Sequence, residues 1–381
     1  MAVAMLEGFD IQAMGVAAPR LAPEFGLGPG EMKWIFAVSN IGMVLGAALG
    51  GWLADRVGRK PVLMTSVAMF GVFTLCVIFT GEFGTLVTAR LLAGLGFGAA
   101  LPNLMALAAE LSVPARRAFT ATLIFCGFPI GGGSVAALTQ VLPPDLDWRV
   151  LFIIGGLLPA LLVPALYWLL PETLTTAPSH APKDRTPTLT VLFGGGRTAP
   201  TLLLWLAFLP TLLILYLILN WLPTLVVAKG FDRAIAPQAS LAFNWASAAG
   251  ALALGWLVDR LGPRWPLVLS YAALIGALVA LGASTNHVAI ITLSGVAGFF
   301  LLGANYALYG VAPSYYPVAM RGTGSGASVA VGRVGSILGP LAAGILLQGG
   351  SSATDVVQYM APVAAVAGIA VCALSFFRRE H

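Results

Sequence analysis

The chain has 381 residues, of which 59% are hydrophobic and 9% are charged, and its mean hydropathy is +0.92. A soluble chain carries about a quarter of its residues as charges, so this composition excludes a soluble enzyme or binding protein and places most of the chain in lipid. The net charge of +5 comes without a basic run on a polar face, so it does not predict nucleic-acid binding. The three cysteines all lie in apolar segments, which argues against a disulfide framework.

In chain order, the first predicted element is the apolar segment Met1–Pro19, which contains Glu7 and Asp10. Later apolar runs are each close to or above the ~20 residues that a membrane-spanning helix needs, and lipid leaves the helix as the way to satisfy their backbone. These runs are Trp34–Ala54, Pro61–Thr80, Phe83–Ala109, Phe119–Leu142, Val150–Leu170, Pro200–Leu222, Pro237–Val258, Trp265–Ala283, Val288–Ala312, Thr323–Leu347 and Tyr359–Phe377. The sequence therefore predicts twelve transmembrane helices, and we expect the first to lack a turn or two at its start.

Arginine and lysine predict the orientation of these helices. With both termini in the cytoplasm, the inner loops and tail hold most of these residues, as the positive-inside rule requires. The outer loops then hold Arg20, Lys33, Arg149, Lys229 and Arg233. We expect a multi-pass protein of the cell inner (plasma) membrane.

The segment Pro171–Ala199 is rich in Pro, Thr and Gly and interrupts the apolar pattern. It predicts an N-terminal six-helix bundle at 1–170, a cytoplasmic linker at 171–199 and a C-terminal six-helix bundle at 200–381. Within this segment, Leu189–Phe193 is interpreted as a short interfacial helix.

The two predicted bundles share a repeated motif. GWLADRVGRK at Gly51–Lys60 recurs as GWLVDRLGPR at Gly255–Arg264, an offset of 204 residues (255 − 51). The loop Pro114–Arg117 recurs as Pro317–Arg321. Such a repeat is typical of transporters in which one half rocks against the other around a midplane site.

The motif at Gly51–Lys60 resembles the signature loop of the major facilitator superfamily, whose fold has twelve transmembrane helices. Ala89–Asn103 and the Gly-Pro segment Gly127–Gly132 resemble further motifs of this family. The resemblance implies a gate on the cytoplasmic side; the alternative is that the positive charges only anchor the topology. The gating residues it implies are Gly51, Asp55, Arg56, Gly58, Arg59, Asp259, Arg260 and Gly262.

Four ionisable residues stand well inside apolar segments: Glu7, Asp10, Arg90 and Arg333. Each costs ~2.5–3.5 kcal/mol at a helix centre, so such residues are functional candidates. Glu7 and Asp10 share one helix face, and one of two close carboxylates is expected to hold a proton near neutral pH. The alternative is that acids and arginines pair only to hold helices together.

The pattern Glu7-Gly8-Phe9-Asp10 resembles one branch of the superfamily, the aromatic acid:proton symporters, as do Gly96–Asn103, Asn220–Pro223 and Ala330–Arg333. This resemblance implies proton coupling at Glu7 and Asp10, roles in activity for Arg90 and Arg333, and an aromatic carboxylate such as a hydroxyphenylpropionate or hydroxybenzoate as substrate. By depth, Arg333 suits the substrate carboxylate best, and Arg90 lies closer to the outer entrance or pairs with Asp10. Side chains that flank the aromatic ring in this interpretation are Asn305, Tyr306, Tyr309 and Phe125.

Two alternatives stay open: an exporter of the same fold that carries an organic anion or drug by proton antiport, and a non-transporting sensor or truncated protein. We do not expect an enzyme, because the sequence shows no nucleophile–base set and no metal-ligand cluster at membrane depth. We expect no cofactor, a proton gradient as the energy source, and a monomer in the bilayer.

Overall fold

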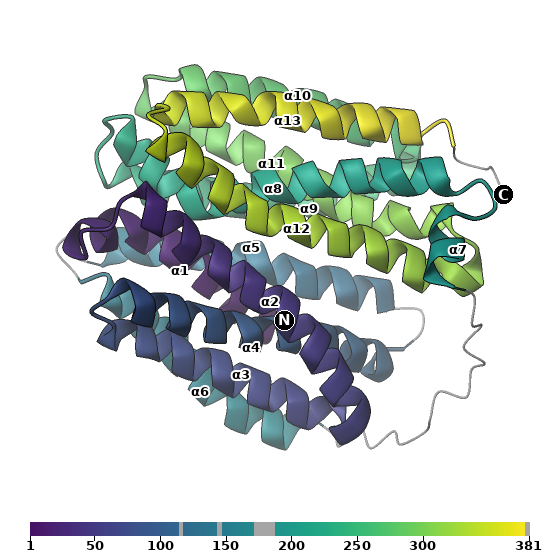
Figure 1. The fold of residues 1–381 in the computed structure, drawn as a ribbon, viewed down its shortest axis with the longest axis horizontal. Helices are drawn as coiled ribbons and strands as arrows, with labels where there is room; N and C mark the ends of the chain where they lie inside the picture. Colours follow the sequence, from purple (N-terminus) through teal and green to yellow (C-terminus); the bar gives the residue numbers. More distant parts are fainter. Residues whose placement is uncertain (114–116, 143–146, 171–186, 378–381) are drawn as a thin grey trace. The chain divides into compact units, whose positions relative to one another are not determined.

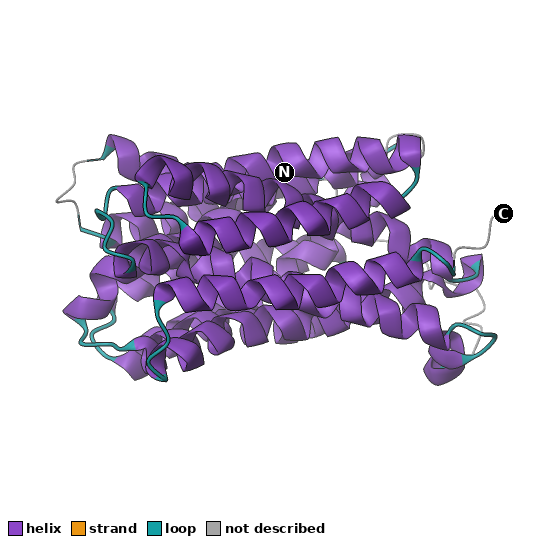
Figure 2. Cartoon of the chain, turned by 90° about the horizontal axis from the view of Figure 1, so that it is seen from above, coloured by secondary structure: helices purple, strands orange, loops and turns teal. Residues whose placement is uncertain are grey.

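The computed structural model describes residues 1–113, 117–142, 147–170 and 187–377, and within these ranges it contains helices and loops but no strand (Figure 2). The long helices are α1 (Ala2–Glu24), α2 (Pro29–Val57), α3 (Arg59–Cys76), α4 (Phe83–Leu111), α5 (Arg117–Val141), α6 (Arg149–Leu169), α8 (Thr198–Ala228), α9 (Ile235–Leu261), α10 (Arg264–Ala283), α11 (His287–Val311), α12 (Arg321–Gln348) and α13 (Ala353–Leu374) (Figure 1). The short helix α7 (Thr188–Phe193) confirms the predicted helix at Leu189–Phe193.

Eleven of the described helices are long and apolar enough to cross a membrane, and they correspond to the eleven later apolar runs. Helix α1 is not among them, because Glu7, Asp10 and Gln12 reduce its apolar character. All three of these polar side chains are nevertheless buried.

The start of α13 differs from the prediction. Hydropathy placed it at Tyr359, whereas the helix begins at Ala353. Ser352 Oγ accepts a hydrogen bond from the Asp355 amide, and the Asp355 carboxylate accepts one from the Ser352 amide. This capping box fixes the start of the helix ahead of its apolar stretch.

The chain divides into two compact units. Unit 1 comprises Met1–Pro178, Leu219–Val227 and Asp232–Leu241, and unit 2 comprises the remainder. The domain bounds 1–170, 171–199 and 200–381 stay a prediction, and most of the predicted linker, 171–186, lies outside the described residues.

In unit 1, α2 packs along α4, α1 along α5, and α3 against both α4 and α6. Glycines set the distance between these helices. A Cβ atom on Gly46 would lie 2.1 Å from the Leu95 carbonyl oxygen, and one on Gly131 would lie 1.9 Å from the Met5 carbonyl oxygen. Small residues of this kind let helix backbones approach closely in a membrane.

Unit 2 shows the same kind of contacts at positions 204 residues further along the chain. A Cβ atom on Gly250 would lie 2.0 Å from the Phe299 carbonyl oxygen, and one on Gly335 would lie 2.2 Å from the Leu209 carbonyl oxygen. The repeat read from two loop motifs therefore extends to the close packing of α9 with α11 and of α8 with α12.

Candidate functional site

Unit 1 holds a buried ion pair between α1 and α4. Arg90 Nη1 lies 2.7 Å from Asp10 Oδ2, and the two side chains are only 3% and 1% exposed. Thr74 of α3 donates a hydrogen bond of 2.7 Å to Asp10 Oδ1, and Arg90 Nε donates one of 3.0 Å to Ser39 Oγ of α2. Both carboxylate oxygens of Asp10 thus accept a hydrogen bond, one of them from a charged guanidinium group.

Glu7 lies three residues before Asp10 on α1 and is 1% exposed. The residue between them that faces α5, Gly8, would place a Cβ atom 2.0 Å from the Phe128 carbonyl oxygen. This tight contact fixes α1 against α5 next to both acids. Unit 1 therefore buries two carboxylates on α1 and one arginine on α4.

A second cluster surrounds Arg333 on α12 of unit 2. Arg333 Nη1 donates a hydrogen bond of 3.1 Å to the Tyr216 hydroxyl of α8. The Tyr309 ring of α11 lies 5.2 Å from that of Phe208, centre to centre, and 6.5 Å from that of Tyr306. Tyr309 is also within electrostatic reach of Arg333 and Tyr216. A cation and several aromatic faces are thus gathered on three helices.

Asn305 lies one helical turn before Tyr309 on α11 and is 3% exposed. Within the described part of the chain, no donor reaches Asn305 Oδ1. A buried acceptor without a donor is costly, so this oxygen is suited to a group that arrives from elsewhere. Phe125 belongs to unit 1, where its ring stacks with that of Phe128 at 6.4 Å.

Sequence reasoning missed the residues that hydrogen-bond to the embedded charges, Ser39, Thr74 and Tyr216, and the ring of Phe208 that packs against Tyr309. Each is of a type that packs in helices without any charge nearby, so a single sequence carries no signal for its role. The pairing of Asp10 with Arg90, by contrast, was one of the two alternatives that the sequence left open.

The predicted gating residues lie in the final part of α2 and α9 and in the turns that follow, each of which contains a glycine with a positive φ angle. Gly58 and Gly262 have φ angles of 95° and 74°, which favour glycine. Arg56 stacks on the Trp52 ring at 3.8 Å, and Arg260 stacks on the Trp256 ring at 4.3 Å.

The two motif loops differ in their ionic contacts. Arg59 forms an ion pair with Glu110, and Lys60 Nζ donates to the carbonyl oxygens of Tyr167 and Leu170 at the end of α6. Asp55 and Asp259 are exposed, and Gly51 has open space beside it. Residues 114–116 of the other predicted cytoplasmic loop lie outside the described residues, and the gating role stays a prediction.

Comparison with known proteins identifies the family. The family model described as Major Facilitator Superfamily matches residues 1–243 and 236–381. The chain belongs to the major facilitator superfamily. Proteins of this family are secondary transporters, so this chain is a multi-pass membrane transporter rather than an enzyme, and it works without a cofactor.

Among relatives of this major facilitator are several transporters of aromatic acids. It is 42% identical to the 3-(3-hydroxy-phenyl)propionate transporter of Escherichia coli (strain K12), over 97% of this chain and 91% of that protein. It is 33% identical to the gallate transporter of Pseudomonas putida, over 91% and 83% of the two chains. It is also 33% identical to the 4-hydroxybenzoate transporter PcaK of Pseudomonas aeruginosa, over 97% and 89%.

Solved structures show the same fold at low sequence identity. A bacterial homologue of the human lysosomal transporter Spinster matches 99% of this chain and 96% of its own, with a TM-score of 0.77 and 16% identity. The nucleoside transporter NupG matches 98% of each chain, with a TM-score of 0.77 and 15% identity. The predicted all-helical major facilitator fold is thereby confirmed.

Proposed function

We propose that this transporter carries out proton-coupled uptake of a small aromatic carboxylate, such as 3-(3-hydroxyphenyl)propionate, across the cell inner membrane by alternating access. The relatives named for hydroxylated aromatic acids support this substrate class. The proposed orientation has both termini in the cytoplasm, because the arginine and lysine distribution then follows the positive-inside rule.

The buried Asp10–Arg90 ion pair is the observation that best supports proton coupling. Asp10 accepts hydrogen bonds from Thr74 and Arg90, and its protonation would remove the charge that attracts Arg90. Uptake of a proton therefore weakens the link between α1 and α4 and changes the balance between conformations. Glu7, one turn away, is the second carboxylate through which the proton passes.

The cluster around Arg333 binds the carboxylate and the aromatic ring of the substrate in this proposal. A guanidinium group binds a carboxylate through two parallel hydrogen bonds, and the rings of Phe208, Tyr306 and Tyr309 offer faces and edges against which an aromatic ring packs. Asn305 Oδ1 then accepts a hydrogen bond from a ring hydroxyl of the substrate. In this proposal the acids of α1 take up and release the proton, and the arginine of α12 binds the substrate.

The inner gate of the transporter is formed by the two motif loops. The turns at Gly58 and Gly262 end α2 and α9, and Arg59 and Lys60 connect the first turn to α4 and α6. These contacts hold the cytoplasmic side closed until substrate and proton are both bound.

Proteoliposomes test the function directly. With acid outside, labelled 3-(3-hydroxyphenyl)propionate accumulates inside, and a protonophore abolishes the accumulation. Gallate, 4-hydroxybenzoate and aliphatic acids, added as unlabelled competitors, define the substrate class. Efflux from preloaded vesicles that requires the opposite gradient, with no accumulation from outside, would instead support an exporter.

A further inference from the structure

The end of unit 2 at which α10 begins and α13 ends carries two exposed aromatic rings beside an arginine. Trp265 is 60% exposed and Phe376 is 69% exposed. The guanidinium carbon of Arg264 lies 5.4 Å from the centre of the Trp265 ring and 4.7 Å from the centre of the Phe376 ring. Helices α10 and α13 pack along each other, so the three residues form one surface, here called the Arg264 patch (Figure 1).

The repeat explains why Arg264 has donors to spare. Its counterpart in unit 1 is Lys60 (264 − 60 = 204), which donates a hydrogen bond of 2.6 Å to the Leu170 carbonyl oxygen at the end of α6. The equivalent carbonyl in unit 2 belongs to Leu374 (374 − 170 = 204), and it accepts a hydrogen bond of 3.2 Å from the Tyr315 hydroxyl instead. Within the described part of the chain, Arg264 contacts the two rings and pairs with no carboxylate. Its N–H groups are therefore available to an acceptor from outside the protein.

Exposed apolar side chains continue from the patch along both helices. Leu269 lies one turn after Trp265 on α10 and Ile369 lies two turns before Phe376 on α13, and both are exposed. The two helices are long and apolar enough to cross a membrane. A cation at the helix ends, aromatic rings next to it and an apolar surface beyond match the phosphate, interfacial region and acyl chains of a phospholipid. A free anion would need only the cation.

We propose that the Arg264 patch binds the headgroup of an anionic phospholipid, whose acyl chains lie along α10 and α13. The guanidinium group donates two parallel hydrogen bonds to the lipid phosphate, which a lysine ammonium cannot do. The rings hold the guanidinium group by cation–π contacts. The motif Gly255–Arg264 holds one acid, Asp259, and two arginines, so its net charge is positive and favours an anionic lipid over a zwitterionic one. This inference does not depend on the substrate of the transporter.

Lipid binding to the purified, delipidated protein tests the inference, and no transport is needed. Phosphatidylglycerol and phosphatidylcholine with the same short acyl chains are added separately, and native mass spectrometry gives the apparent Kd of the first bound lipid. We expect the wild type to bind phosphatidylglycerol roughly five- to tenfold more tightly than phosphatidylcholine. Arg264→Gln should abolish this preference. Equal affinities of the wild type for the two lipids would overturn the proposal.

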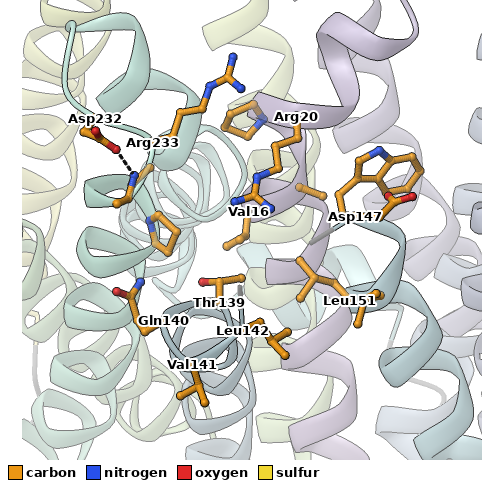
Figure 3. Close-up of a pocket in the computed structure, with 17 residues that line it drawn as sticks. Val16, Arg20, Thr139, Gln140, Val141, Leu142, Asp147, Leu151, Asp232 and Arg233 are labelled. Atoms are coloured by element: carbon orange, nitrogen blue, oxygen red, sulfur yellow. Dashed lines mark hydrogen bonds between the residues drawn. The ribbon is translucent and has the colours of Figure 1, made fainter. Parts of the chain in front are cut away.

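Arg233→Gln is the matched control. Arg233 is an exposed arginine on the segment that leads into α9, and no aromatic ring stacks on it within the described residues (Figure 3). The variant removes the same charge and should keep the wild-type preference for phosphatidylglycerol. An equal loss of preference in Arg233→Gln and Arg264→Gln would show that net charge alone attracts the lipid, and would overturn the site.

Two further measurements test the source of the phosphate and the role of the rings. Inorganic phosphate in large excess should not displace phosphatidylglycerol, because it has no acyl chains; displacement would overturn the assignment to a lipid. The double variant Trp265→Leu, Phe376→Leu keeps the charge and should weaken phosphatidylglycerol binding roughly two- to fivefold. An unchanged affinity would refute a site built from the arginine and its two rings. Melting temperatures of the lipid-free variants check that each is folded.

Discussion

Asp10 shows how a charged residue is tolerated in an apolar helix. Its two oxygens accept hydrogen bonds from Thr74 and Arg90, each at 2.7 Å, and Arg90 is held in turn by Ser39. The sequence identified the acid and the arginine because embedded charges are rare. It could not identify the hydroxyl groups that accept from Arg90 and donate to Asp10, because serine and threonine are common in helices and reach their partners only through the tertiary fold.

At this scale we predict that Asp10→Asn destabilises the protein, because it leaves the Arg90 charge buried without its counter-charge. Removal of one partner from a buried pair costs about 3–5 kcal/mol. Adding Arg90→Gln should restore most of the loss, since both charges are then absent. Thermal unfolding of the single and double variants in one detergent checks this, and a double variant less stable than Asp10→Asn would contradict it.

A second prediction at the residue scale concerns Asn305. If Asn305 Oδ1 accepts a hydrogen bond from the ring hydroxyl, Asn305→Leu should reduce the preference for 3-(3-hydroxyphenyl)propionate over 3-phenylpropionate. A single such hydrogen bond is worth about 1–3 kcal/mol when its loss leaves a buried group unpaired, or roughly tenfold in the ratio of kcat/KM values. An unchanged ratio would show that Asn305 does not recognise the hydroxyl.

At the scale of the helices, the sequence predicted most boundaries because lipid forces every long apolar run into a helix. Two features of the helices could not be predicted from the sequence, each for a physical reason. Helix α13 starts early because a capping box outweighs hydropathy at Ser352. Which helices pack together, such as α1 with α5, could not be predicted, because one apolar helix face resembles another until the glycine contacts are known.

Glycine contacts between helices give a third prediction, tested on α9. Gly250→Ala should lower thermal stability by about 1–3 kcal/mol, because its Cβ atom would lie 2.0 Å from the Phe299 carbonyl oxygen. Gly255→Ala is the matched control on the same helix, since nothing lies within 4 Å of its Cβ position. Equal melting temperatures for the two variants would refute the role of Gly250 in packing.

The junction of α1 with α6 gives a pH-dependent prediction. Hydrogen bonds from the Arg149 and Trp148 side chains hold the pKa of Glu24 below its ordinary value. Because the folded pKa is the lower one, the stabilisation is fully present above the unfolded pKa of about 4.3 and is lost as pH falls through the folded value.

Melting temperatures of the wild type and of Glu24→Gln therefore should differ at neutral pH and converge in acid. Glu82→Gln, which removes another exposed carboxylate, serves as the charge control. A difference between wild type and Glu24→Gln that stays constant down to pH 3 would contradict the role assigned to this carboxylate.

At the scale of the whole molecule, the repeat could be predicted because scaffold features recur 204 residues apart, from the loop glycines Gly58 and Gly262 to the packing glycines Gly46 and Gly250. By contrast, the residues 204 positions away from the four embedded charges are all uncharged. Unit 1 holds the acid–arginine pair and unit 2 holds the Arg333 cluster. This asymmetry accords with a transporter that handles a proton and an organic anion with different helices.

In the proposed function, the buried carboxylate of Asp10 couples the proton to the substrate. Uptake of labelled 3-(3-hydroxyphenyl)propionate by proteoliposomes with acid outside, together with counterflow exchange without a gradient, tests it most directly. We predict that Asp10→Asn exchanges substrate in counterflow but no longer accumulates it in response to the pH gradient, whereas the wild type does both. Accumulation by Asp10→Asn to the wild-type level, driven by the same gradient, would contradict the account.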